Sequence, residues 1–282
     1  MLSRLFYVLA VLWLPMAAQN PANAAKNTRY LALGDSLAFG FSPLVMPVDL
    51  SMYHGYPQIV SKALDINLAN ASCFGETSGH FLDLSVQDLG CQQWRANFPL
   101  FVPYAGTQMD YATAYLSSNR KAELVTIDIG LNDLGVLLKN CNGNTACALA
   151  GAPAVLAAYG QNIFTIYSRI RGTGYQGPIV AVTAYAFDYS DPVQVGGILP
   201  LNGILSGTTT AFGGKVADVF TAFATAAAPF GGKVCATGLL VKLPDGTCDT
   251  HPSAAGQSLI AQTVLATLDG NNGDGKQDKS DN

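Results

Sequence analysis

The sequence predicts an α/β fold of three layers, α/β/α, with a central parallel sheet of about five strands. Short apolar runs rich in β-branched residues alternate with longer Ala-rich or amphipathic segments along most of the 282 residues. This order of strand and helix implies right-handed crossovers, which place helices on both faces of the sheet. The length suits one domain with one sizeable core, and neither a repeat nor an inter-domain linker interrupts it.

Each expected strand is a short apolar run, the pattern of a parallel strand that is buried on both faces. The expected strands are residues 29–34, 65–71, 122–130, 177–185 and 232–237. Longer segments that are Ala-rich or amphipathic lie between them and indicate helices. The expected helices are residues 56–64, 107–119, 152–171, 208–228 and 253–268.

Two long irregular regions follow strands, residues 39–53 and 71–107. Connections beyond the carboxyl ends of parallel strands form the side on which open α/β folds bind ligands. The aromatic and aliphatic residues of these regions therefore predict an apolar rim to a cleft. A single residue such as Phe41 or Trp94 can also simply pack over the loop as satellite core.

The two ends of the chain differ from the region between them. Residues 1–24 combine an early Arg, an apolar run cut short by Pro15 and an ending that fits an A-x-A cleavage site, which is typical of a secretory signal peptide rather than of a membrane anchor. Residues 269–282 are polar and Gly-rich, which predicts a disordered tail. We therefore expect a domain at residues 25–268 of a secreted or periplasmic protein.

Six cysteines in an exported chain indicate disulfides. Six cysteines allow 15 connectivities, and proximity along the chain favours three local pairs. No C-x-x-C pair or zinc-like spacing occurs, so no metal site is expected. The expected pairs are Cys73 with Cys91, Cys141 with Cys147, and Cys235 with Cys248.

The composition argues against a nucleic-acid partner. Charged residues make up 12% of the chain, hydrophobic residues make up 49%, and the formal net charge is -4. Proteins that bind nucleic acid use clustered Lys and Arg to neutralise phosphates, and this chain has no such cluster.

The first expected strand breaks at Gly34-Asp35-Ser36. A serine at the carboxyl edge of a sheet can turn its hydroxyl toward a cleft and act as a nucleophile. The same residues also suit a turn or a helix N-cap, so the motif alone is weak.

Three further segments strengthen this interpretation because they also follow strands or lie in the loops beyond them. Gly75 lies in the loop after the second expected strand, Asn132 follows the third, and His251-Pro252 precedes the last helix. Separately, each is also an ordinary turn, cap or helix entry. Together, in this order and across residues 31–256, the four blocks resemble those of the SGNH, or GDSL, hydrolase family.

The resemblance implies a flavodoxin-like SGNH hydrolase fold and a role for each block. It implies Ser36 as the nucleophile and His251 as its base, since a neutral imidazole within about 3 Å of the hydroxyl is well matched to neutral pH. It also implies an oxyanion hole formed by the backbone N–H groups of Ser36 and Gly75 and by the Asn132 side chain. No cofactor is expected.

One position departs from the family pattern. The family usually has an Asp three residues before the His, but here Cys248 holds that position and Asp249 lies only two residues before His251. We expect Asp249 to orient the imidazole, with a backbone carbonyl near Cys248, or more remotely Asp245, as alternatives. His54 is expected to be a loop residue, and His80 a rim residue that can contact substrate.

The sequence therefore predicts a secreted serine ester hydrolase that cleaves acyl or lipid esters through an acyl-enzyme intermediate. The apolar segment 39–53 favours substrates with a hydrophobic tail and allows transient contact with a lipid surface. A carbohydrate acetyl esterase is the alternative, and a catalytically silent binding module is less favoured because all four blocks are intact. A monomer is expected.

Overall fold

The computed structural model describes residues 29–270. The signal peptide expected at residues 1–24 lies outside the described residues, as do residues 271–282 of the expected tail.

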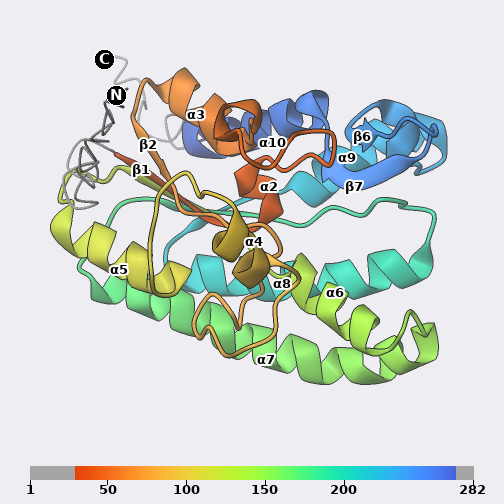
Figure 1. Ribbon diagram of the computed structural model, residues 1–282, viewed down its shortest axis with the longest axis horizontal. Helices are drawn as coiled ribbons and strands as arrows, with labels where there is room; N and C mark the ends of the chain where they lie inside the picture. The colour runs from red at the N-terminus through yellow and green to blue at the C-terminus, as the bar shows by residue number, and fades with distance from the viewer. Residues whose placement is uncertain (1–28, 271–282) are drawn as a thin grey trace, which may run out of the picture.

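A parallel sheet of five strands forms the centre of the described region (Figure 1). The strands are β1 Tyr30–Gly34, β2 Leu68–Asn70, β3 Leu124–Asp128, β4 Ile179–Val182 and β5 Lys215–Ala217. Their order is β2-β1-β3-β4-β5, so the chain winds in opposite directions on the two sides of β1. Open α/β sheets bind ligands at the carboxyl ends of the strands beside such a switch point. Here that point lies between β1 and β3.

Helices cover both faces of this sheet, which confirms the expected three layers (Figure 1). The helices are α2 Ser36–Phe39, α3 Tyr56–Leu64, α4 Cys91–Asn97, α5 Gln108–Ser118, α6 Leu131–Asn140, α7 Thr145–Gly172, α8 Pro192–Ala211, α9 Val219–Ala227 and α10 Ala254–Asp269, with 3-10 helices η2 Leu50–Met52, η3 Ala228–Phe230 and η4 Val234–Thr237. One layer contains α3, α9 and α10, and the other contains α5, α6, α7 and α8 (Figure 1).

The side chains of β1 show why both faces need a cover. Leu31 and Leu33 pack toward α5, α7 and α8, whereas Tyr30 and Ala32 pack toward α3, α9 and α10. Successive strand residues point to opposite faces, so a sheet buried on both sides requires a continuous apolar run. That requirement explains the uninterrupted hydrophobic segment 30–33.

The prediction of a fifth strand at residues 232–237 is wrong. Val234–Thr237 form the 3-10 helix η4 instead of a strand. Shortly before it, Gly232 has a φ of 86°. The fifth strand is β5, which lies inside the segment 208–228 that the sequence predicts as one helix. That helix is divided because α8 ends at Ala211 and α9 begins only after β5. A strand of three residues is too short to produce a recognisable alternation.

The sequence does not predict α8 or the antiparallel hairpin of β6 Leu240–Lys242 and β7 Cys248–Pro252. The start of α8 does carry a signal, because Asp191 caps it by accepting from the N–H groups of Val193 and Gln194, and Pro192 is its first residue. The rest of α8 contains glycines and an internal proline, Pro200, which are unfavourable in helices and therefore do not predict one.

Helix α7 is the one helix in residues 29–270 that is long and apolar enough, by length and composition, to cross a membrane. It packs against α5, α6 and α8, as helices of an α/β layer do. Its buried side chains belong to the larger sheet core and are Tyr159, Ile163, Ile166, Tyr167 and Ile170.

The three expected disulfides are confirmed, and all six cysteines are paired. The pairs are Cys73–Cys91, Cys141–Cys147 and Cys235–Cys248. Disulfides persist in oxidising compartments, so they indicate an extracytoplasmic protein.

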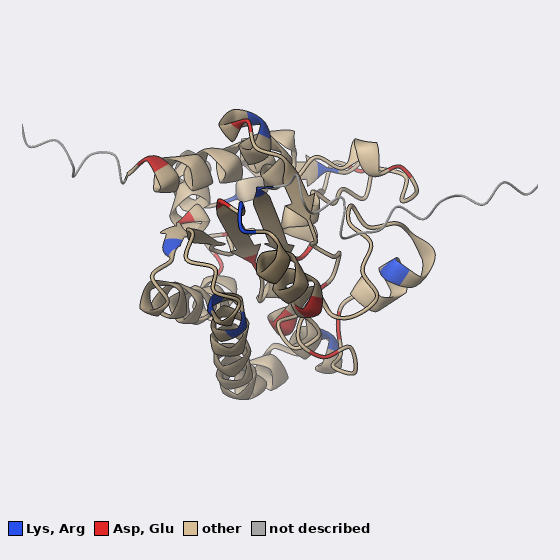
Figure 2. Cartoon of the chain, turned by 90° about the vertical axis from the view of Figure 1, so that its left-hand side faces the viewer, with Lys and Arg blue, Asp and Glu red and all other residues tan. Residues whose placement is uncertain are grey.

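Charged residues are sparse and of both signs when the chain is viewed from the face that carries the amino ends of the strands. Figure 2 shows this face, where Lys, Arg, Asp and Glu lie scattered over several elements. This distribution is in keeping with the low charge content of the sequence.

Candidate functional site

Ser36 lies directly beyond the carboxyl end of β1, as the first residue of the short helix α2. Gly34 makes the break possible, because its φ is 138° and a Cβ there would lie 2.2 Å from the carbonyl oxygen of Asp128 on β3. Asp35 then caps α2 by accepting the N–H of Leu37 at 3.0 Å. The two residues before Ser36 thus turn the chain and leave the serine at the sheet edge.

His251 lies on β7, and its ring meets Ser36. The distance from His251 Nε2 to Ser36 Oγ is 2.9 Å. The Tyr185 hydroxyl, just beyond β4, donates to the carbonyl oxygen of Thr250 at 2.6 Å. The disulfide at Cys248 fixes the start of β7 to η4. The segment that carries His251 is therefore held at two points.

Asp249 reaches the imidazole in spite of the short spacing. Its Oδ1 lies 2.5 Å from His251 Nδ1 and also accepts the backbone N–H of His251 at 2.9 Å. The hydrogen bond from His251 lowers the pKa of Asp249, so the carboxylate stays ionised. Asp245 instead accepts the N–H of Thr247 at 2.9 Å and lies in its own turn. The structure thus joins Asp249, and not Asp245, to His251 and Ser36.

Gly75 lies in the loop after β2, where two parts of that loop meet closely. Its φ is 75°, and a Cβ would lie 2.5 Å from the carbonyl group of Leu89. The N–H of Leu89 also donates to the carbonyl oxygen of Gly75 at 2.8 Å. Both the conformation and the close approach require glycine.

Asn132 is the second residue of α6, after β3. Its Nδ2 donates to the carbonyl oxygen of Glu76 at 2.9 Å and to Asp35 Oδ2 at 3.2 Å. Glu76 follows Gly75, and Asp35 precedes Ser36. The Asn132 amide is therefore held between the two blocks that carry the other expected oxyanion donors.

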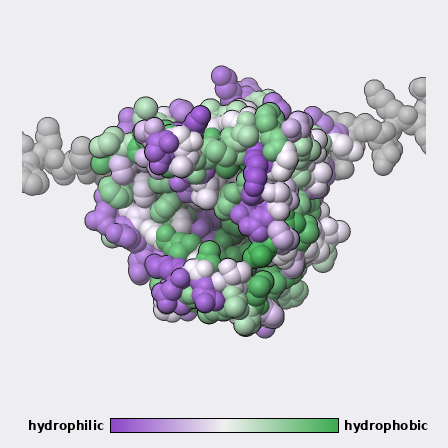
Figure 3. All heavy atoms as spheres, turned by 90° about the vertical axis from the view of Figure 1, so that its right-hand side faces the viewer, coloured by the Kyte–Doolittle hydropathy of each residue, from purple (hydrophilic) through white to green (hydrophobic). Residues whose placement is uncertain are grey.

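Ser36, Gly75, Asn132 and His251 line one cavity of about 230 Å³. Figure 3 shows the side of the molecule toward which the strands run, and this face is hollowed near its centre with hydrophobic residues at the border of the hollow. The cavity is smaller than the roughly 300–1,000 Å³ of most small-molecule sites. It is lined by Asp35, Ser36, Leu37, Phe74, Gly75, Leu89, Leu131, Asn132, Tyr185, Phe187, Thr250 and His251.

An aromatic cluster from the two irregular regions borders this cavity. The Phe41 ring lies 4.7 Å from the His251 ring, centre to centre, and the Phe74 ring lies 6.1 Å from it. Trp94 is buried, with 6% of its surface exposed, so it is core rather than rim. The cluster comprises Phe39, Phe41, Val45, Leu50, Tyr53, Phe74, Trp94, Phe98, Leu100 and Phe101.

The model of the GDSL-like Lipase/Acylhydrolase family matches residues 32–259. The chain belongs to this family. It is therefore a carboxylic ester hydrolase. The comparison with curated proteins found no match.

Solved structures with the same fold include lipases and esterases. Phospholipase A1 from Streptomyces albidoflavus NA297 is 19% identical, with a TM-score of 0.58 over 86% of this chain and 99% of that chain. An extracellular lipase from Streptomyces rimosus is 18% identical, with a TM-score of 0.59 over 85% and 99%. A variant of an acetyl xylan esterase from Geobacillus stearothermophilus is 16% identical, with a TM-score of 0.52 over 86% and 95%.

In this GDSL-family hydrolase, two acids near Ser36 are buried, which the sequence does not predict. Burial raises the pKa of Asp35 to about 6 and raises the pKa of Asp128 well above its ordinary value. The hydroxyl of Tyr56 donates to Asp128 Oδ1 at 2.7 Å. The signal in the sequence is an acid inside the apolar strand 124–128, where a charge is costly unless it is neutralised or paired.

His80 is buried, with 1% of its surface exposed, and is not the rim residue expected from the sequence. Its Nδ1 pairs with Glu76 Oε1, and its Nε2 lies 3.6 Å from Asp88 Oδ2, too far for a hydrogen bond. The Glu76 hydrogen bond and charge raise the pKa of His80 in spite of its burial. His54, by contrast, is an exposed loop residue, as expected.

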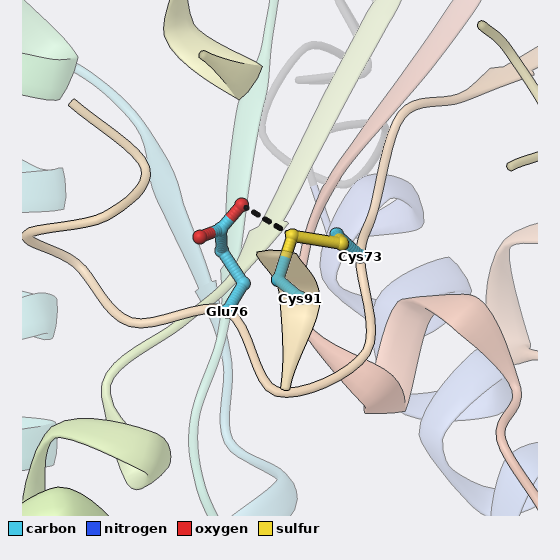
Figure 4. Close-up of side chains that lie close together, drawn as sticks. All are labelled: Cys73, Glu76 and Cys91. Carbon is cyan, nitrogen blue, oxygen red and sulfur yellow. Dashed lines mark hydrogen bonds between the residues drawn. A yellow bond between two sulfur atoms is a disulfide. The ribbon is translucent and has the colours of Figure 1, made fainter. Parts of the chain in front are cut away.

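Glu76 connects this ion pair, through Gln108, to Gly34 at the end of β1. Gln108 Nε2 donates to Glu76 Oε2 at 3.2 Å and to the carbonyl oxygen of Gly34 at 3.0 Å, and Gln108 Oε1 accepts the N–H of Gly34 at 2.6 Å. Figure 4 shows the Glu76 carboxylate beside the disulfide, with Oε2 at 3.5 Å from Cys91 Sγ. Cys73 and Cys91 lie close enough to Glu76 to form a metal site with it, but their sulfurs are bonded to each other. They therefore offer no thiolate to a metal ion.

Proposed function

We propose that this chain is a secreted serine hydrolase that cleaves carboxylic esters through an acyl-enzyme intermediate. The observation that carries the proposal is the 2.9 Å contact between Ser36 Oγ and His251 Nε2, with Asp249 on the opposite nitrogen of the ring. A nucleophile, a base and an orienting acid at such distances act as one unit.

In the first half of the reaction, Ser36 Oγ attacks the ester carbonyl carbon while His251 Nε2 accepts the hydroxyl proton. Asp249 holds the proton on Nδ1 and stabilises the imidazolium that forms. The carbonyl oxygen becomes an oxyanion, which accepts hydrogen bonds from the N–H groups of Ser36 and Gly75 and from Asn132 Nδ2, whose longer hydrogen bond to Asp35 is then given up. Collapse of this intermediate expels the alcohol, which takes the proton from His251.

In the second half, water attacks the acyl-Ser36 ester. His251 accepts a proton from the water, and the same donors stabilise the second oxyanion. Expulsion of Ser36 Oγ, which regains its proton from His251, releases the carboxylic acid. No step requires a cofactor.

The proposed substrates are acyl or lipid esters. The cavity of about 230 Å³ holds the reacting ester and a short part of the acyl chain. A longer chain must leave the cavity past Phe41 and Phe74, which flank the His251 ring and offer apolar contact. The small cavity also suits an acetyl group, so a carbohydrate acetyl esterase is the second candidate.

A series of p-nitrophenyl esters from acetyl to palmitoyl tests both the reaction and the substrate class. A lipid-type enzyme hydrolyses chains beyond butyryl at least as well as acetate, whereas an acetyl esterase loses activity steeply with length. Ser36→Ala should lose all measurable turnover, and Ser118→Ala on α5 is the matched control. Equal activity of the two variants would remove Ser36 from the mechanism.

We also propose export with cleavage near Ala25, a monomeric state and no nucleic-acid partner. The apolar run and A-x-A ending of residues 1–24 and the three disulfides support export. Amino-terminal sequencing of the protein from the culture medium or periplasm tests the cleavage site, and an intact amino terminus would contradict it.

A further inference from the structure

Residues 42–52, here called the apolar loop, expose four large apolar side chains next to the candidate site. Leu44 is 57% exposed, Met46 73%, Val48 69% and Met52 56%. Single exposed apolar residues are ordinary, but four within nine positions form a patch. Such a patch on a secreted protein points to a surface that it contacts.

Other residues anchor the apolar loop to the protein. Val45 and Leu50, from the same loop, are partly buried and belong to the aromatic cluster. The hydroxyl of Tyr53 also donates to the carbonyl oxygen of Val45 at 3.4 Å. The loop is therefore anchored by one apolar set and presents a second set outward.

The backbone and polar groups of the apolar loop bond within the loop. The N–H of Val45 donates to Ser42 at 3.2 Å, that of Asp49 to Met46 at 3.3 Å, and that of Met52 to Asp49 at 3.2 Å. The carboxylate of Asp49 accepts the N–H and the hydroxyl of Ser51 at 3.0 and 2.6 Å. Internal bonding of this kind lowers the cost of moving a loop from water into an apolar surface.

The position of the apolar loop connects that surface to the reaction. Phe41 precedes the loop directly and lies 4.7 Å from the His251 ring. A molecular surface that contacts Leu44 and Met46 is therefore close to the point at which an ester enters the cavity.

The chemistry of the patch favours a neutral lipid surface over an anionic membrane or a protein. Residues 39–53 contain no Lys or Arg and one acid, Asp49, and the chain has a net charge of -4. Binding to anionic lipid requires Lys and Arg near the surface. Protein interfaces centre on Trp, Tyr and Arg, whereas the aromatic residues of this region pack inward and the exposed set is aliphatic and Met.

We propose that the apolar loop docks onto the surface of a neutral, zwitterionic lipid aggregate and so presents lipid esters to Ser36, an inference that rests on the proposed ester hydrolysis. Leu44, Met46, Val48 and Met52 enter the interface between headgroups and acyl chains. Binding is driven by apolar contact and is insensitive to salt.

The test measures binding and hydrolysis separately. Binding of the Ser36→Ala chain to phosphatidylcholine vesicles is measured by sedimentation at low and high salt, so that hydrolysis does not disturb the vesicles. The triple variant Leu44→Ser, Met46→Ser, Val48→Ser is made in both the Ser36→Ala and the wild-type background. The control is Leu149→Ser with Leu199→Ser, two exposed leucines on α7 and α8.

We expect the triple variant to lose vesicle affinity by at least about ten-fold, since burial of even one of the three side chains contributes roughly that factor. Hydrolysis of soluble p-nitrophenyl acetate should stay within two-fold of wild type, and the control should bind normally. Equal binding by the triple variant and the control, absence of binding, stronger binding to anionic vesicles, or self-association through the loop would overturn the proposal. Vesicle binding without hydrolysis of any ester would overturn the proposed function and leave the docking surface intact.

Discussion

Replacing Asp249 with Asn tests how its carboxylate serves His251. Oδ1 of Asp249 accepts two hydrogen bonds from the same residue, one from Nδ1–H and one from the backbone N–H. The backbone N–H can only donate, so an Asn at this position must keep its carbonyl oxygen there. That oxygen still accepts Nδ1–H, and the substitution preserves the tautomer that Ser36 requires.

The expected loss therefore comes from charge alone. A hydrogen bond to a charged group contributes about 1.5–3 kcal/mol, against about 0.5–1.5 kcal/mol for a neutral one. The difference of about 1–2 kcal/mol corresponds to a drop in kcat of about five- to thirty-fold, less than the roughly ten-thousand-fold loss seen where an Asn imposes the wrong tautomer. Asp249→Ala removes both bonds and should cost about ten-thousand-fold.

The assay is kcat for p-nitrophenyl acetate hydrolysis by wild type, Asp249→Asn, Asp249→Ala and His251→Ala, with circular dichroism to check folding. The expected order of activity is wild type, Asp249→Asn, Asp249→Ala and His251→Ala, with KM little changed. Full activity in both Asp249 variants would show that a Ser36-His251 dyad is sufficient. A loss in Asp249→Asn as large as in Asp249→Ala would refute the argument from the shared oxygen.

Three other changes have expected outcomes. Asn132→Ala should lower kcat by about a hundred- to a thousand-fold with little effect on KM, as removal of one oxyanion donor does, and a change confined to KM would exclude that role. Gly34→Ala should lower the free energy of unfolding by about 3 kcal/mol or more in urea, because its Cβ would lie 2.2 Å from a backbone oxygen, whereas Gly196→Ala, with nothing within 4 Å, should not destabilise the protein. The pKa of Asp35 is about 6 in the folded state and 3.8 ordinarily, so the folded state binds the proton more tightly. Stability should therefore fall by about 2 kcal/mol from pH 4 to pH 6 relative to Asp35→Asn, and parallel pH profiles would contradict this.

The elements that position the blocks could be predicted because local sequence determines them. Segment 30–33 is apolar on both faces, and Gly34 interrupts it where the chain turns. The helix expected at 56–64 agrees with α3, and the one at 253–268 differs from α10 by one residue at each end. In such segments the periodicity and the end signals agree with the tertiary structure.

The fifth strand could not be predicted because its conformation depends on its neighbours. Residues 215–217 extend only because they pair with β4, and nothing in three residues distinguishes them from the adjoining helices. Residues 234–237 have β-favouring composition, but glycines with positive φ on either side, at 232 and 238, close them into a 3-10 turn. Tertiary context decides such short segments.

Part of the candidate site could likewise be predicted from the sequence, and part could not. The four blocks each carry a recognisable local pattern, and the topology brings them to one sheet edge. The interactions of Glu76 with His80 and of Asp35 with Asp128 involve buried acids whose partners become apparent only when the loop of residues 71–107 folds over the sheet. No periodic pattern in the local sequence indicates that these acids and His80 are buried. For this reason His80 was expected to be a rim residue.

Labelling with a fluorophosphonate probe tests the central claim most directly, because only an activated serine reacts with it. After digestion, mass spectrometry should find the phosphonate on Ser36 of the wild-type chain, no adduct in Ser36→Ala, and labelling slowed by at least about a thousand-fold in His251→Ala. An adduct on another serine, or equal labelling of wild type and Ser36→Ala, would contradict the assignment of Ser36 as the nucleophile.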